Sequence, residues 1–170
     1  MSNKLKLFKM KIPCKNFVTS GGTFTAVAGT GIPYLSKTAA NTTSMIAIPI
    51  PILQGHESGQ GVKLKSVEIP IRLATANADS APTVTLYRQN MLAVAGASAD
   101  ITASALTTTL TGATVTADAN DRLLTCTVDS PALDYDTEDK AGYVANLRIN
   151  AGTSTALRVY DAIAYFEVPV

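Results

Sequence analysis

The sequence predicts an all-β protein, an antiparallel two-sheet sandwich whose simplest form is a single jelly roll. Apolar residues recur with a period of two, which is typical of strands with one buried face. Residues with branched Cβ atoms are abundant, and no run of ten residues shows the period of an amphipathic helix. An immunoglobulin-like sandwich is the alternative, although the chain contains no Trp and no suitably spaced Cys pair.

Each expected strand is an alternating run that ends at a cluster of Gly, Pro, Asn or Asp. In the clearest run, Ile46, Ile48 and Ile50 alternate with smaller residues. Eight or nine strands are expected, near residues 4–12, 23–27, 44–53, 62–74, 83–89, 100–110, 122–128, 142–150 and 156–168. The last two are expected to form a hairpin around Gly152.

The alternation changes phase inside two expected strands, 4–12 and 62–74. A one-residue slip turns every later side chain to the other face, and a β-bulge absorbs such a slip. We therefore expect a bulge in each strand. Asp161 interrupts the last strand in a similar way, which indicates either a third bulge or a strand covered on both faces by a partner subunit.

Two prolines indicate the position of the strand 44–53 in its sheet. Pro49 and Pro51 lie two residues apart, so both remove an N–H donor from the same edge. Because proline is confined to edge strands and bulges, this strand is expected at an edge that resists further strand pairing.

The length of 170 residues fits one sandwich domain over 1–170, with residues 1–15 forming either its first strand or an N-terminal arm. Charge is unevenly distributed, although the net charge is only +1. Residues 1–65 contain eight Lys and one acid, whereas residues 66–170 contain six basic and twelve acidic residues. Either copies of the chain pair basic part against acidic part, or the fold interleaves the two parts.

The near-neutral net charge gives no field that would attract nucleic acid or a membrane surface, so neither is an expected partner. Charged and apolar residues alternate from Lys4 to Lys11, a pattern that lacks the apolar core of a signal peptide. Cys14 and Cys126 do not have the spacing of metal ligands. We expect two free, buried thiols, and the sequence leaves a disulfide between them open.

Chemistry-bearing residues are few. The only histidine, His56, lies beside Glu57 and Ser58 in a Gly-rich segment. Adjacent residues of an extended loop point apart, so they do not form the hydrogen-bonded chain of a catalytic triad. We therefore expect no catalytic residue, no enzymatic activity and no cofactor.

One acidic cluster is a candidate metal site. Its alternating oxygen ligands suit Ca²⁺, but it lacks the central Gly and the distal Glu of an EF-hand loop. The preferred interpretation is a solvated loop. The cluster consists of Asp134, Asp136, Glu138 and Asp139.

Several stretches between residues 61 and 168 combine strand alternation with loops rich in Ala and Thr. They are Gly61–Arg72, Ala81–Arg88, Leu123–Pro131, Ala141–Arg148 and Val159–Phe166. Together they resemble a loose family of small phage and metagenomic virion-associated proteins, from which residues 1–60 depart. The resemblance implies a sandwich fold and a place in or on a particle, and it carries over no functional residue.

The expected function is therefore that of a structural virion protein: a capsid, decoration or spike component of a phage-like particle that acts by self-assembly. Its partners would be copies of itself and other virion proteins, and its location the virion, after synthesis in the host cytoplasm. The alternative is a β-sandwich module that binds a glycan or a host receptor through its loops.

Removing divalent cations tests the acidic cluster. If Asp134 and its neighbours form a solvated loop, EDTA leaves the melting temperature unchanged, because no bound ion stabilises the folded state. A fall in the melting temperature that Ca²⁺ restores would contradict this interpretation.

Overall fold

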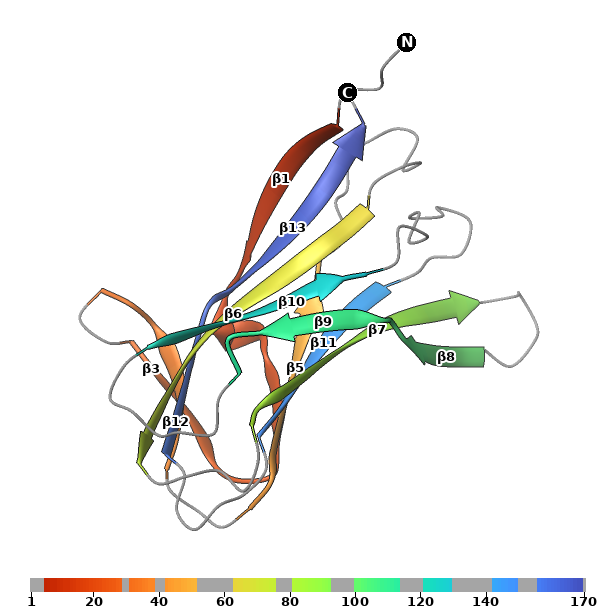
Figure 1. Ribbon diagram of the computed structural model, residues 1–170. Coiled ribbons are helices and arrows are strands. Elements are labelled where there is room, and N and C mark those ends of the chain that lie inside the picture. The colour runs from red at the N-terminus through yellow and green to blue at the C-terminus, as the bar shows by residue number, and fades with distance from the viewer. Residues whose placement is uncertain are drawn as a thin grey trace.

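The computed structural model describes residues 5–28, 31–38, 42–51, 63–75, 81–92, 100–113, 121–129, 142–149 and 156–169. In these residues the chain forms thirteen strands and one short 3-10 helix, η1 (Cys14–Asn16). All strand pairs are antiparallel, and the strands form two sheets (Figure 1). The predicted all-β, two-sheet architecture is confirmed.

The larger sheet, sheet A, has eight strands. They are β1 (Leu5–Ile12), β3 (Phe24–Val27), β4 (Tyr34–Lys37), β6 (Lys63–Thr75), β9 (Thr108–Thr111), β10 (Arg122–Val128), β12 (Ala156–Tyr160) and β13 (Ala162–Pro169). The smaller sheet, sheet B, has five strands. They are β2 (Val18–Ser20), β5 (Ser44–Ile50), β7 (Thr83–Leu92), β8 (Asp100–Ala105) and β11 (Gly142–Ile149).

The order of the strands is that of a jelly roll. In sheet A the order β1-β13-β6-β10 brings the first and last strands together, and in sheet B the order is β5-β11-β7-β8. From β5 to β7 the chain passes from sheet B to sheet A and back, as in the two Greek keys of this fold. Strand β2 extends sheet B, and the β3–β4 pair extends sheet A.

The core lies between the sheets and is formed by the alternating residues that the sequence indicates. The fully buried side chains come from both sheets and include Ile46, Ile48, Val67, Ile69, Ile71, Leu86, Leu124, Leu147 and Val159. Burying one such side chain stabilises the fold by about 1.5–3 kcal/mol, before conformational entropy is subtracted. Cys14 and Cys126 are free and buried, as expected.

Strand β6 is the centre of sheet A because three strands pair with it. Strand β10 occupies one edge, and β13 and β12 follow one another along the other edge. From Val159 to Ile163 the chain advances four residues, while their partners on β6, Ile71 and Glu68, are only three residues apart. The extra residue is a bulge, so the first of the two explanations offered for Asp161 is confirmed.

The bulge divides sheet A into two branches. After the bulge, β13 pairs with β1 and forms one branch. Before the bulge, β12 pairs with β4, and β4 pairs with β3, which forms the other branch (Figure 1). Asp161, at the bulge, binds the end of β1 and the start of η1: its Oδ1 accepts a hydrogen bond from the Cys14 backbone N–H at 2.8 Å, and its Oδ2 lies 2.8 Å from Lys11 Nζ. We call this junction the fork.

The bulge expected in 62–74 is present, because the register of β6 against β13 shifts by one residue between Leu64 and Ser66. The bulge expected in 4–12 is absent: β1 pairs with β13 without interruption. Its phase change has another cause. The side chains from Lys6 to Lys9 are exposed on both faces, so no buried face constrains their pattern.

The expected edge position of 44–53 is wrong for part of the strand. β5 pairs with β11 on one side, and Met45, Ile46 and Ala47 pair with β2 on the other. Pro49 lies beyond the end of this second pairing, where its missing N–H costs no ladder bond to β2. The three-residue β2 was too short to be recognised in the sequence.

The predicted hairpin around Gly152 is also wrong. β11 pairs with β5 and β7 in sheet B, whereas β12 pairs with β4 and β6 in sheet A. Turn-forming residues mark a change of direction, and this signal is the same whether the chain turns within a sheet or crosses to the other one.

Substituting Asp161 tests the fork. Asp161→Ala leaves the Cys14 N–H and Lys11 without their partner, and we expect the free energy of unfolding to fall by about 1–3 kcal/mol. Denaturant unfolding measures this loss. Asp129→Ala is the control, because Asp129 accepts a hydrogen bond from Thr109 at an exposed site. Equal effects of the two substitutions would contradict a special role for Asp161.

The same variant has a pH signature. Burial would raise the pKa of Asp161, but hydrogen bonds from Lys11 and Cys14 outweigh it, so its pKa lies below the usual value. A lowered folded-state pKa stabilises the protein above the unfolded-state pKa of about 3.9, and this stabilisation disappears as the pH falls through the folded-state pKa. The difference between wild type and Asp161→Ala should therefore shrink in acid.

Candidate functional site

A pocket of about 310 Å³ lies at the fork and opens to solvent. It is lined by Lys11, Ile32, Pro70, Asp121, Tyr160 and Asp161. We call it the fork pocket.

The lining residues come from five separate parts of the chain. Lys11 is near the end of β1, Ile32 precedes β4, and Pro70 lies in β6. Asp121 immediately precedes β10, and Tyr160 and Asp161 lie at the bulge. Ile69 and Ile71 of β6 point into the core, so Pro70 between them points away from it. The pocket is therefore on the outer face of sheet A.

Lys11 and Asp161 form the charged wall of the pocket. The Asp161 side chain is only 12% exposed, whereas that of Lys11 is 69% exposed. The hydrogen bond and charge of Asp161 raise the pKa of Lys11. Because an ammonium group has three N–H bonds, Lys11 keeps donors for a ligand while it is paired with Asp161.

Two tyrosines form the aromatic part of the site. Tyr160 donates a hydrogen bond from its hydroxyl to Asp121 Oδ1 at 3.0 Å. Its ring lies 5.7 Å from that of Tyr34, with the ring planes inclined at 59°. The guanidinium of Arg158 lies 5.0 Å from the centre of the Tyr34 ring. The tilted pair and the cation–π contact hold the ring of Tyr160, which lines the pocket, against its neighbour Tyr34.

This arrangement offers three kinds of contact within one small volume. Asp121 and Asp161 present carboxylate oxygens with further lone pairs, and Lys11 presents N–H donors. Tyr160, Pro70 and the side chain of Ile32, which is 65% exposed, present aromatic and apolar surface. Such a combination suits a ligand that has both hydroxyl groups and C–H faces.

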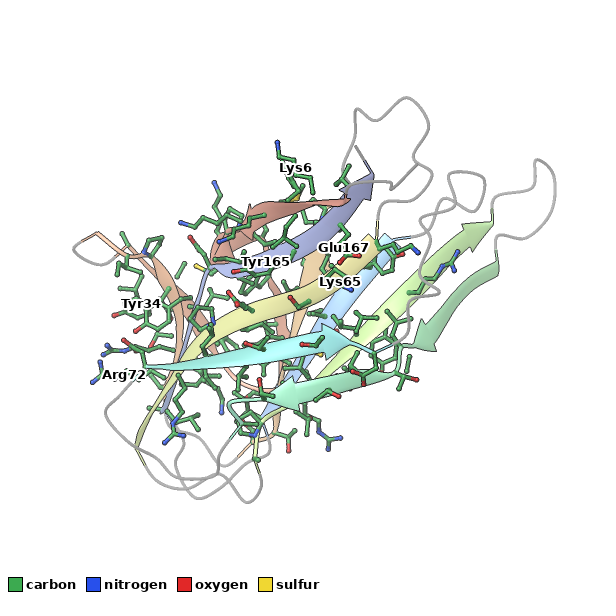
Figure 2. The ribbon with its side chains drawn as sticks, turned by 45° about the horizontal axis from the view of Figure 1, so that its top comes forward. Lys6, Tyr34, Lys65, Arg72, Tyr165 and Glu167 are labelled. Carbon is green, nitrogen blue, oxygen red and sulfur yellow. The ribbon has the colours of Figure 1, made fainter. Side chains whose placement is uncertain are left out.

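Elsewhere on sheet A, polar contacts link strands from distant parts of the chain. Tyr165 donates to Glu68 at 2.6 Å, and Lys9 lies over the Tyr165 ring. Lys65 pairs with Glu167 at 3.2 Å (Figure 2). The ion pairs Lys11–Asp161 and Lys65–Glu167 each join a lysine of residues 1–65 to an acid of residues 66–170. Over the described residues the fold thus interleaves the basic and acidic parts.

The site residues considered from sequence are not among the residues that the structure describes. His56, with Glu57 and Ser58, lies outside the described residues, and so does the candidate calcium cluster of Asp134, Asp136, Glu138 and Asp139. No group of three His, Cys, Asp or Glu side chains in the described part of the chain is arranged to hold a metal ion. Burial raises the pKa of the Cys14 and Cys126 thiols, which keeps them protonated at neutral pH.

The residues of the fork pocket were not recognised as a site from sequence. Tyr34 and Tyr160 are far apart in the chain, so the sequence does not indicate that their rings pack together. Asp161 interrupts an alternating strand, but that interruption indicates a bulge and not a pocket.

No helix in the described part of the structure is long and apolar enough to cross a membrane.

No family model matches the chain, and no curated protein matches it. Among solved structures, it is similar to TmCBM61 in complex with β-1,4-galactotriose, with 7% identity and a TM-score of 0.44 over 94% of this chain and 92% of the other. It is also similar to the family 11 carbohydrate-binding module of Clostridium thermocellum in complex with a β-1,3-1,4-mixed-linked tetrasaccharide. That match has 8% identity and a TM-score of 0.34 over 94% of this chain and 87% of the other. At these scores neither structure establishes a common family, and the fold rests on the strand pairing given above.

Titrating Tyr160 tests the electrostatics of the pocket. Burial and the hydrogen bond to the Asp121 carboxylate both raise the pKa of Tyr160, so it should ionise above the usual value of about 10. The phenolate absorbance of wild type minus that of Tyr160→Phe isolates this group. Asp121→Asn removes the negative charge and should lower the pKa of Tyr160. An unchanged titration in that variant would contradict the contact.

Proposed function

We propose that the protein is a non-catalytic carbohydrate-binding module and that a sugar unit of its ligand occupies the fork pocket. The observation that supports this most is the position of Tyr160, whose ring lines the same open pocket as the carboxylates of Asp121 and Asp161.

Sugars combine hydroxyl groups, which donate and accept hydrogen bonds, with faces made of C–H bonds. In the fork pocket Asp121 and Asp161 accept from hydroxyl groups, Lys11 donates to them, and Tyr160 covers a C–H face. Tyr160 holds the side chain of Asp121, and Lys11 and the Cys14 backbone hold that of Asp161. These side chains therefore lose little conformational entropy when a ligand binds.

The shape of the pocket suits part of a chain better than a small molecule enclosed on all sides. Its volume of about 310 Å³ is at the lower end of the range for ligand sites. Because the pocket opens to solvent on the outer face of a sheet, further sugar units can continue across that face.

Replacing Tyr160 tests the proposal. We expect Tyr160→Ala to weaken binding of the oligosaccharide selected on a glycan array by roughly tenfold or more, because stacking area and the orientation of Asp121 are both lost. Titration calorimetry measures the affinity. Tyr87→Ala is the matched control, since Tyr87 is also half-buried but lies on β7 in sheet B. Equal weakening by both substitutions, or no array signal, would contradict the proposal.

A second candidate function, a structural subunit of a phage-like particle, is favoured by the surface of β1. Leu7 is 55% exposed and Phe8 is 45% exposed, and neighbouring residues of a strand point to opposite faces. Within the described residues, β1 pairs only with β13, so its outer edge is free for another strand. Exposed apolar residues beside a free edge are typical of surfaces that bind other protein chains.

Native mass spectrometry tests this second candidate. A particle subunit should form assemblies of defined copy number, and Leu7→Ser should shift them toward monomer because it removes apolar contact area. Leu123→Ser is the control, since Leu123 is similarly exposed, at 46%, but lies on β10. A wild-type chain that remains monomeric at high concentration would contradict the proposal that copies of the chain assemble through β1.

A further inference from the structure

Two arginines lie directly opposite one another beside the fork pocket. Arg72 of β6 and Arg158 of β12 are cross-strand partners on the outer face of sheet A. Like charges in this position repel one another and destabilise a sheet. Pro70 and Tyr160 of the pocket lie two residues away on the same strands, so the arginine pair is about 7 Å from the pocket lining.

The two guanidinium groups differ in their surroundings. Arg158 lies over the Tyr34 ring, where the ring electrons offset part of its charge. The Nε of Arg72 is buried and has no hydrogen-bond partner in the described part of the chain. Arg88 and Arg122 also have such an Nε, but both make other interactions. Figure 2 shows Arg72 and Tyr34 near each other at one end of the sheet.

Among the described residues around the pocket, positive charges outnumber negative ones. Lys11, Arg72 and Arg158 carry positive charge, and Asp121 and Asp161 carry negative charge. Lys11 is already paired with Asp161, and Asp121 accepts a hydrogen bond from Tyr160. Among the described residues the surplus positive charge therefore lies at the arginine pair, where an anion would relieve the repulsion.

We propose that Arg72 binds a negatively charged substituent of the ligand, a carboxylate or a sulfate ester, so that the module prefers acidic oligosaccharides to neutral ones. This inference rests on the proposed carbohydrate-binding function. The planar guanidinium also has Nη–H donors, two of which lie parallel and match the two oxygens of either group. The substituent belongs to the sugar unit next to the one in the fork pocket, because the arginine pair adjoins that pocket.

The experiment compares oligogalacturonate, which carries carboxylates, a carrageenan oligosaccharide, which carries sulfate esters, and neutral oligogalactose by titration calorimetry. We expect wild type to bind at least one acidic ligand roughly tenfold or more tightly than the neutral ligand, since charge-assisted hydrogen bonds are the stronger ones. Arg72→Gln should remove that preference and leave neutral binding nearly unchanged. Arg72→Lys should keep only part of the preference for acidic ligands, because lysine keeps the positive charge but lacks the two parallel N–H donors of a guanidinium group.

The matched control is Arg88→Gln, since Arg88 shares the buried Nε but lies in sheet B, and it should leave the preference unchanged. An NMR titration with inorganic sulfate, followed at the Arg72 Nε–H resonance, tests the anion site without any sugar. Equal affinity for acidic and neutral ligands in wild type would overturn this inference and leave the proposed function intact. A sulfate response without binding of any oligosaccharide would overturn the proposed function and the preference for acidic oligosaccharides, and would leave only an anion site at Arg72. No response to sulfate or to any oligosaccharide would overturn that anion site as well.

Discussion

The carboxylate of Asp161 is the contact on which the arrangement of sheet A depends. β12 and β13 share one edge of β6, and an extra residue between them prevents the outer strands from continuing as a single regular layer. β1 follows one branch and β4 the other. Asp161 accepts the Cys14 N–H and the Lys11 ammonium, so it satisfies polar groups that the interruption would otherwise leave unpaired.

The fork pocket follows from the same irregularity. An uninterrupted sheet would pair its strands continuously at this point, whereas the diverging branches leave room between Lys11, Ile32 and Tyr160. Bulges commonly re-aim side chains near functional sites. Here the bulge brings Asp161 and Tyr160 to the pocket, while the hydrogen bonds that repair the break hold the carboxylate in place. One structural device therefore supports both the fold and the proposed site.

The sequence predicted the jelly roll well because alternation is a local property of each strand. The runs around Ile48, Ile69 and Leu147 are buried as expected. Pairing between distant segments was less predictable: the position of β11 and β12 in different sheets and the short strand β2 left no local signal. The same reason applies to the site, since Lys11, Asp121 and Tyr160 meet only after three distant segments pair with β6 or its neighbours.

A crystal structure of the protein with a bound oligosaccharide tests the central claim most directly. The account predicts a sugar ring at the fork, with hydroxyl groups within hydrogen-bond distance of Asp121 and Asp161 and a C–H face against Tyr160. A ligand seated on the outer face of sheet B, with the fork occupied only by solvent, would contradict it.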